Sequence, residues 1–181
     1  LKKIREIAYY LIATGAKKGD HIAVTGKNSP EWALAYFAIS FAGCIIVPLD
    51  YSLHIEDMEK ILAFGDVDRI FIDGEKIDEI DKEGKLFKEK ISLEPESKGH
   101  KYVLDLTGPE TELPKLHAED TAAMLFTSGT TGTPKGVMLS FSNFMSSTLS
   151  SQRLFDVYPT DVFYAILPIH HAYTMTAVLL E

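Results

Sequence analysis

The run from Phe126 to Gly136 holds the residues best suited to chemistry. Its sequence is FTSGTTGTPKG, in which glycines and hydroxyl side chains surround one lysine and there is no carboxylate. Glycine lets backbone N–H groups approach an anion closely, the hydroxyls donate further hydrogen bonds, and Lys135 adds a positive charge. The whole chain carries a formal net charge of -8, so this local lack of negative charge is not a general property. The composition predicts a binding loop for an anion with many oxygens, such as a polyphosphate.

Two strands are expected to flank this run. Residues 121–126 precede it and have the length and apolar content of a strand, and residues 137–139 read as a strand after it. The run is not a Walker A loop, because Lys135 lies between Pro134 and Gly136 and no helix follows directly. On composition alone, a Gly/Ser/Thr turn without any ligand remains the alternative.

The segment TSGTTGTPKG resembles the signature of the adenylate-forming enzymes, which include acyl-CoA synthetases, luciferases and nonribosomal peptide adenylation domains. The family pattern is roughly [YF]-[ST]-S-G-[ST]-T-G-x-P-K-G, and every fixed position matches here. A motif of this length is far more specific than a lone G-x-G-x-x-G. The resemblance implies that the run holds the phosphates of ATP, that Lys135 acts in catalysis, and that the Thr127 hydroxyl contacts Mg²⁺. The nucleotide-binding residues that it implies are Thr127, Ser128, Gly129, Thr130, Thr131, Gly132, Thr133 and Lys135.

A second group of candidate residues, His170 and His171, follows an expected apolar strand at residues 162–167. Histidine can donate a hydrogen bond to a carboxylate or phosphate, and it titrates near neutrality. Metal binding competes with this interpretation, although adjacent histidines on a strand do not share a face and no cysteine or carboxylate cluster is close in sequence. From the residues alone, two structural histidines at a strand end are an equal alternative.

The resemblance also covers this segment. Adenylate-forming enzymes carry L-P-x-x-H after their phosphate loop, and His171 aligns with that histidine. The continuation His-His-Ala-Tyr is similar to bacterial enzymes acting on long-chain fatty acids. In the family this segment lies beside the carboxylate substrate. The resemblance therefore implies that His171 is catalytic and binds substrate, that His170 binds substrate, and that Tyr173 lines the pocket; a core aromatic is the alternative for Tyr173.

The first part of the chain alternates strands and helices. Strands are expected at residues 20–25, 44–47 and 69–72, and helices at residues 32–41 and 55–62, the first of them preceded by a capping group in Asn28-Ser29-Pro30-Glu31. This β-α-β-α-β order predicts an α/β fold, with parallel sheet layers covered by helices. The stretch from Val24 to Asp50 is similar to the N-terminal portion of the adenylate-forming enzyme fold, where it serves as scaffold.

A division into two parts is expected near residue 110. Residues 1–110 are predicted to form a first α/β subdomain, within which the Lys-, Glu- and Asp-rich residues 73–101 form a charged surface excursion. Residues 111–181 are predicted to begin a second α/β subdomain that carries the phosphate loop, after a linker with breakers at Gly108 and Pro114. Ser140 or Ser142 is expected to cap the helix that follows the loop.

Composition narrows the functional classes. The chain has 181 residues, of which 46% are hydrophobic and 24% charged, as in ordinary globular proteins. The negative net charge argues against a nucleic-acid partner, and no apolar run is long enough for a transmembrane segment. The single cysteine, Cys44, lies in an apolar stretch and is expected to be a buried small hydrophobe. A reducing, cytoplasmic location is predicted from this cysteine usage.

The family reaction implied by the resemblance has two steps, in which a carboxylate attacks ATP and a thiol such as coenzyme A then displaces AMP. The expected function is therefore the N-terminal part of an ATP-dependent fatty acid–CoA ligase, using ATP, Mg²⁺ and coenzyme A. The alternatives are an aryl or amino acid substrate, or a nucleotide-binding remnant without catalysis. Later family motifs do not occur in this sequence, so a complementing C-terminal polypeptide or self-association is expected, and the chain alone is predicted to be inactive.

Overall fold

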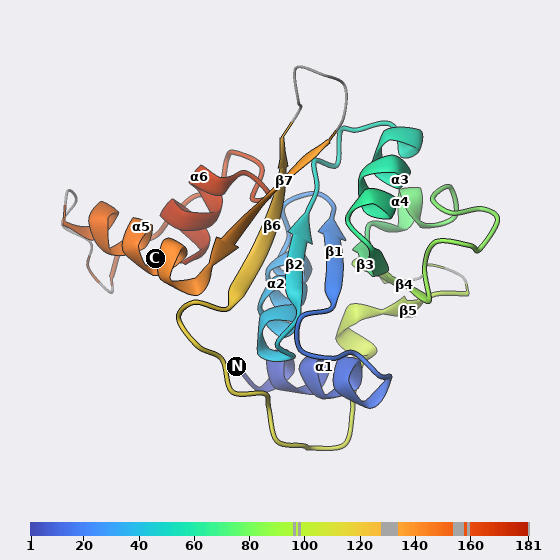
Figure 1. Ribbon diagram of the computed structural model, residues 1–181, viewed down its shortest axis with the longest axis horizontal. Coiled ribbons are helices and arrows are strands. Elements are labelled where there is room, and N and C mark those ends of the chain that lie inside the picture. The colour runs from blue at the N-terminus through green and yellow to red at the C-terminus, as the bar shows by residue number, and fades with distance from the viewer. Residues whose placement is uncertain (96, 98, 128–133, 154–157, 159, 181) are drawn as a thin grey trace.

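One mixed sheet organises the chain in the computed structural model, which describes residues 1–95, 97, 99–127, 134–153, 158 and 160–180. Within these residues a 7-stranded sheet has the order β5-β4-β3-β1-β2-β6-β7 (Figure 1). The strands are β1 His21–Thr25, β2 Ile45–Pro48, β3 Val67–Ile72, β4 Glu89–Ser92, β5 Lys101–Tyr102, β6 Thr121–Thr127 and β7 Lys135–Ser140. Neighbouring strands are parallel except for β6 and β7, which form an antiparallel pair. This mostly parallel sheet confirms the predicted α/β class.

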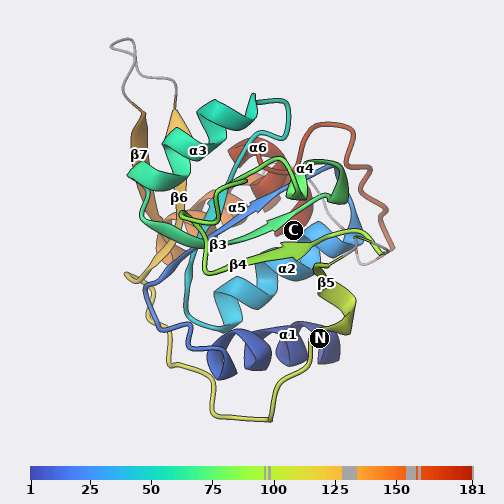
Figure 2. The same cartoon turned by 90° about the vertical axis from the view of Figure 1, so that its right-hand side faces the viewer.

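Helices cover both faces of the sheet. They are α1 Lys2–Ala13, α2 Pro30–Phe41, α3 Ile55–Phe64, α4 Gly74–Ile77, α5 Phe141–Gln152 and α6 Ala172–Thr174, with a 3₁₀ turn η1 at Val103–Asp105 and a π turn η2 at Met175–Leu179. Figure 2 shows α1 and α2 on one face of the sheet and α3 and α4 on the other. Helices α5 and α6 lie together beside β7 (Figure 1).

Strand β1 shows why this arrangement follows from the sequence. Ile22 and Val24 belong to the core beneath α1 and α2, whereas Ala23 belongs to the opposite core, with Met58 and Leu62 of α3. Successive side chains of a strand point to opposite faces, so a strand covered on both sides needs an unbroken apolar run. The apolar residues of β1 meet that requirement.

The beginning of α2 agrees with its expected capping signal. The Ser29 side chain is the N-cap and accepts a hydrogen bond from the Trp32 backbone N–H at 3.1 Å, and Pro30 occupies the first turn. Trp32 is fully buried and stacks on Tyr36 with ring centroids 5.5 Å apart. The cap sets the residue at which α2 begins, and the buried aromatic pair holds the helix against the core.

Cys44 lies just before β2 and is 1% exposed. Burial, followed by the influence of nearby acidic groups, raises the pKa of its thiol to about 12. A thiol with so high a pKa forms little thiolate near neutrality, so it is a poor nucleophile. The expectation of a buried small hydrophobe is confirmed.

The charged residues 73–101 are not a surface excursion throughout, which corrects the sequence-based expectation. Strand β4 pairs in parallel with β3, and the Leu93 N–H donates to the Ile72 carbonyl at 2.9 Å. Ile77, Ile80 and Ile91 are at most 1% exposed. These isoleucines are spaced among charged residues, so the average composition of the segment is polar. Ile77 and Ile80 nevertheless fill the core beneath α3, and Ile91 fills the core on the α1–α2 face.

Residues 162–167 are not a strand, which corrects a second expectation. Val162, Tyr164 and Ile166 are 93%, 83% and 75% exposed, and no described strand pairs with this segment. Its carbonyl groups at Ala165 and Leu167 instead accept hydrogen bonds from the side chain of Asn28. Apolar content alone predicted a strand here, but a strand also needs a partner for its backbone.

The expected boundary near residue 110 falls in the connection between η1 and β6. Strand β6 pairs in parallel with β2, with Ile46 opposite Ala123, so the sheet continues across this position. The connection lies close against α1, because a Cβ on Gly108 would come within 2.4 Å of the backbone between Tyr9 and Tyr10. The division into two subdomains stays a prediction. Both predicted parts contribute strands to the same sheet.

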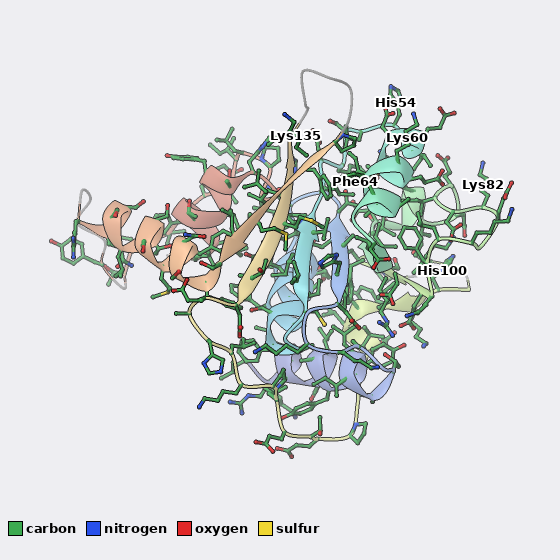
Figure 3. The ribbon with its side chains drawn as sticks, in the orientation of Figure 1. His54, Lys60, Phe64, Lys82, His100 and Lys135 are labelled. Carbon is green, nitrogen blue, oxygen red and sulfur yellow. The ribbon has the colours of Figure 1, made fainter. Side chains whose placement is uncertain are left out.

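We predict that Ile91→Ala lowers the free energy of unfolding by about 2–4 kcal/mol, because it removes a fully buried side chain from the core. Lys82→Ala is the control: Lys82 is exposed and points away from the protein (Figure 3), and we expect a change of no more than about 0.5 kcal/mol. Urea unfolding measures both. Equal small effects would show that residues 73–101 form a surface excursion after all.

Candidate phosphate and carboxylate site

The hairpin of β6 and β7 holds the two ends of the predicted phosphate loop together. Thr127 is the last residue of β6 and Lys135 is the first residue of β7, and the two lie directly opposite in the register. Both are exposed, and Lys135 stands at the end of the hairpin where the connecting loop joins β7 in Figure 3. The remaining predicted phosphate-binding residues, Ser128, Gly129, Thr130, Thr131, Gly132 and Thr133, lie outside the described residues.

Close packing supports the base of this hairpin. Gly136 faces Phe126 in the register, and a Cβ at Gly136 would meet the Met124 sulfur at 2.9 Å. Phe126 contacts Phe64 of α3 edge to face, with ring centroids 6.2 Å apart. A side chain at Gly136 would have to displace the Met124 side chain, and α3 contacts the strand that leads into the loop.

The two histidines differ sharply in their surroundings. The His170 side chain is 8% exposed, and its Nε2 lies 3.8 Å from Oδ1 of Asp50, the second residue after β2. The His171 ring is tilted against it at a centroid distance of 4.3 Å, and His171 is exposed. Tyr173 is 71% exposed, so it is no core aromatic in this structure. Of the two rings, His171 is the one that a substrate can reach.

The surroundings of His170 and Asp50 give the two side chains different protonation states. Burial lowers the pKa of His170, the neighbouring His171 lowers it further, and Asp50 raises it in part. Burial raises the pKa of Asp50, but the Ser52 N–H at 2.8 Å and the two histidines outweigh this, and the pKa ends below its ordinary value. Near neutral pH the structure therefore pairs an ionised Asp50 with a neutral His170. The buried His170 Nε2 has no hydrogen-bond partner among the described residues.

The hairpin and the histidines meet at one edge of the sheet. Thr127 ends β6 and Asp50 follows β2, and these strands are parallel neighbours. Ligands of open parallel sheets collect beyond the carboxyl ends of the strands. The cavities found elsewhere, of about 570 Å³ beside Tyr10 and about 530 Å³ beside Glu59, include neither the hairpin end nor the histidines. The edge near Thr127 and Asp50 is therefore the candidate site.

Sequence reasoning missed two residues at this edge. Asn28 was assigned to the start of α2, and Asp50 to a scaffold segment. Ser29 alone caps the helix, while the Asn28 amide bonds the segment that carries the histidines. Their places directly after β1 and β2 are the signal that could have identified them, because polar residues there face the ligand edge.

A resident metal ion has little support from protein groups alone. Among the described residues, no group of three or more His, Cys, Asp or Glu side chains could hold a metal ion. The Thr127 hydroxyl is a single, neutral oxygen ligand. Mg²⁺ commonly binds through one or two carboxylates together with substrate phosphates, so Thr127 suits an ion that is bound mainly by ATP.

Comparison with known proteins assigns the family. A family model described as AMP-binding enzyme matches residues 1–180. This chain belongs to that family. The match agrees with the motif at residues 127–136 and with the fold, and the relatives of the family include long-chain fatty acid–CoA ligases. Among the described residues, no helix has the length and apolar character needed to cross a membrane.

Curated members of the AMP-binding family differ in the acid that their names specify. An L-proline–[L-prolyl-carrier protein] ligase from Streptomyces coelicolor is 30% identical and covers 89% of this chain and 32% of its own length. A long-chain fatty acid–CoA ligase from Bacillus subtilis is 28% identical and covers 96% of this chain and 37% of its own length. The chain thus spans about a third of the length of these relatives.

A solved structure of the family shows the same fold. It is o-succinylbenzoate coenzyme A synthetase from Bacillus subtilis in complex with ATP and magnesium ion, with a TM-score of 0.82 and 24% identity. The match covers 99% of this chain and 36% of the synthetase. The likeness establishes that the described sheet and helices correspond to the N-terminal part of the adenylate-forming fold.

We predict that Asp50→Asn lowers the pKa of His170 further, because it removes the one charge that raises it. The groups that act on the ring are Asp50, from the end of β2, and His171, from its own segment. Histidine ring resonances followed by NMR across a pH titration measure the change. Glu56→Gln, an exposed acid on α3, is the control; an unchanged His170 pKa in Asp50→Asn would contradict the pairing.

The same shift predicts how stability depends on pH. The folded pKa of His170 lies below its ordinary value of 6.5, so the unfolded chain binds more protons in that interval. The stability that comes from neutral His170 is full above about pH 6.5 and is lost as the pH falls through the folded pKa. Urea unfolding between about pH 7.5 and about pH 5 should show this loss, and His170→Phe should reduce it.

Proposed function

We propose that this chain is the N-terminal, ATP-binding part of an AMP-forming acid–CoA ligase that activates a fatty acid. The observation that carries the proposal is the β6–β7 register, which sets Thr127 opposite Lys135 at the ends of the matching signature motif. The family assignment and the exposed position of both residues support it. The activity of the whole enzyme is part of the proposal, since the chain spans about a third of its curated relatives.

In the proposed first step, a carboxylate oxygen of the acid attacks the α-phosphorus of ATP. The bond to the bridging oxygen breaks, and pyrophosphate leaves with the electron pair, so that an acyl-adenylate remains. Negative charge builds on the phosphate oxygens, and groups that are already in position stabilise it best. Lys135 is proposed to supply positive charge there, with the backbone N–H of Thr127 and the backbone N–H groups and hydroxyls of residues 128–133 as further donors. In the second step the thiol of coenzyme A displaces AMP.

Magnesium is proposed to accompany ATP rather than to reside in the protein. When it is bound, it neutralises charge on the phosphate oxygens. Thr127 is proposed to add one hydroxyl ligand to it from the end of β6. Thr127→Val should then weaken the binding of Mg–ATP and leave the binding of metal-free ATP nearly unchanged, as measured by calorimetry with and without a chelator. Thr121→Val, at the other end of β6, serves as the matched control.

The acid is proposed to approach His171. This ring is exposed beside the buried side chain of His170, and it can donate a hydrogen bond to a carboxylate. In the same segment of the chain, the apolar side chains of Ile166 and Leu167 and the aromatic side chain of Tyr173 are at least 53% exposed. Apolar surroundings of a carboxylate-binding group suit an acid with a hydrocarbon chain. The fatty acid–CoA ligase relative also supports this class of acid.

An amino acid substrate is the second candidate. The prolyl-carrier protein ligase is 30% identical to this chain, slightly more than the fatty acid–CoA ligase. Against this, the Asp50 carboxylate beside the histidines is already directed to His170, whose Nε2 lies 3.8 Å from its Oδ1. The cytoplasm and a complementing polypeptide remain our predictions for the location and the partner.

ATP binding by Lys135→Ala tests the phosphate loop. A charge-assisted hydrogen bond contributes about 1.5–3 kcal/mol, so we expect the dissociation constant to rise by about 10- to 100-fold. Lys82→Ala is the matched control, because this exposed lysine lies well away from the hairpin in Figure 3. Calorimetry or a fluorescent ATP analogue gives both affinities. Equal affinities of wild type and Lys135→Ala would refute the assignment of the loop.

Pyrophosphate exchange tests the choice of acid. The chain is mixed with the remaining portion of a family member, and exchange between labelled pyrophosphate and ATP is followed with a long-chain fatty acid, an aryl acid or proline. The proposal expects the fatty acid to support the fastest exchange. Faster exchange with proline would favour the second candidate, and no exchange with any acid would favour a nucleotide-binding remnant.

A further inference from the structure

The side chain of Asn28 joins two segments that are far apart in the sequence. Its Nδ2 donates to the carbonyls of Ala165 and Leu167, each at 2.9 Å, and its Oδ1 accepts from the Ile169 N–H at 3.0 Å. The amide thereby uses both donors and an acceptor on one stretch of backbone. A carboxamide carries two N–H donors and a separate carbonyl acceptor at one end, which is the set of groups that these three bonds use.

These bonds act where the described backbone makes only local hydrogen bonds, such as the Ile166 N–H to the Tyr164 carbonyl and the His171 N–H to the Pro168 carbonyl. Residues 161–167 belong to no described helix or strand. Ile169, two residues later, is 5% exposed and packs in the core with Met175. The Ile169 backbone N–H on Asn28 and the buried Ile169 side chain thus fix the residue directly before His170. The direction in which the chain enters His170 and His171 follows from these two attachments.

Asn28 is itself held in place from β3. The preceding residue, Lys27, donates its backbone N–H to Oδ2 of Asp73 at 2.9 Å, and Asp73 is 3% exposed. Gly26 makes this approach possible, because a Cβ there would lie 2.3 Å from Oδ1 of Asp73. The turn after β1 therefore has a defined position relative to the sheet. It can transmit that position to the histidine segment through the Asn28 amide.

We propose that Asn28 is a positioning residue that holds the His170–His171 segment against the sheet edge, with His170 over Asp50 and His171 turned to the substrate carboxylate. The role of His171 rests on the proposed function. The attachment of the segment to Asn28 rests on the hydrogen bonds and can be tested without any substrate.

The test compares the whole chain with three variants by NMR. Asn28→Ala removes all three hydrogen bonds, whereas Asn28→Asp keeps an acceptor for the Ile169 N–H and loses both donors. Ser29→Ala is the matched control: it removes the cap of α2 and costs about 1 kcal/mol, but it does not touch the histidine segment. Amide exchange of Ile169, the ring resonances of both histidines, and the His171 response to decanoate are recorded.

For Asn28→Ala we expect the Ile169 amide to exchange about tenfold faster, as for the loss of one ordinary hydrogen bond. We also expect its His170 pKa to move toward the ordinary value, and the His171 response to decanoate to weaken at least threefold. Asn28→Asp should preserve the slow exchange of Ile169 and restore part of the decanoate response. Ser29→Ala should change the free energy of unfolding and none of these three signals.

Two failures can be told apart. If wild-type His171 shows no response to decanoate, the proposed carboxylate site fails, and Ile169 exchange and the His170 pKa still decide whether Asn28 holds the segment. If wild type responds and Asn28→Ala matches it in exchange, His170 pKa and decanoate response, the positioning role is refuted. Equal effects of Asn28→Ala and Ser29→Ala would show that Asn28 contributes only to general stability.

Discussion

The parallel pairing of β6 with β2 is the contact on which the rest of the candidate site depends. Ile46 opposite Ala123 joins the hairpin to the sheet built by the first part of the chain. Because the two strands run the same way, the end of β6 at Thr127 and the end of β2 before Asp50 lie at one edge. The proposed phosphate loop and the proposed carboxylate-binding histidine can act on one pair of substrates only when they share that edge.

Buried polar side chains gather at the same edge, although the burial of a polar group costs free energy. Asp73 and the His170 side chain are almost completely buried. Asp73 accepts a hydrogen bond from the Lys27 N–H, whereas the His170 Nε2 lies 3.8 Å from the Asp50 carboxylate and has no hydrogen-bond partner among the described residues. Burying a polar group without a partner costs free energy, so such groups persist where the fold supplies partners or where function needs them. Here they connect the ends of three parallel strands, and the histidine segment rests on them.

Much of the fold was predictable because its signals are local. Ser29-Pro30 and the apolar residues on all sides of the helix predict the buried helix α2. Short apolar runs predict β1 and β2. The expectation for residues 73–101 was wrong because single isoleucines among many charges leave the average composition polar. The strand expected at residues 162–167 was wrong because apolar content does not state whether a neighbouring strand exists.

The sequence by itself determined the chemistry of the phosphate loop. The order of glycines, hydroxyls, Pro134 and Lys135 is a local property, and it sufficed to indicate the family and to predict a phosphate ligand. Only the tertiary structure decided which residues accompany His171. Asn28 and Asp50 lie more than a hundred positions away from it, and a hydrogen bond or ion pair at such a separation exists only after the parallel strands have brought their ends together.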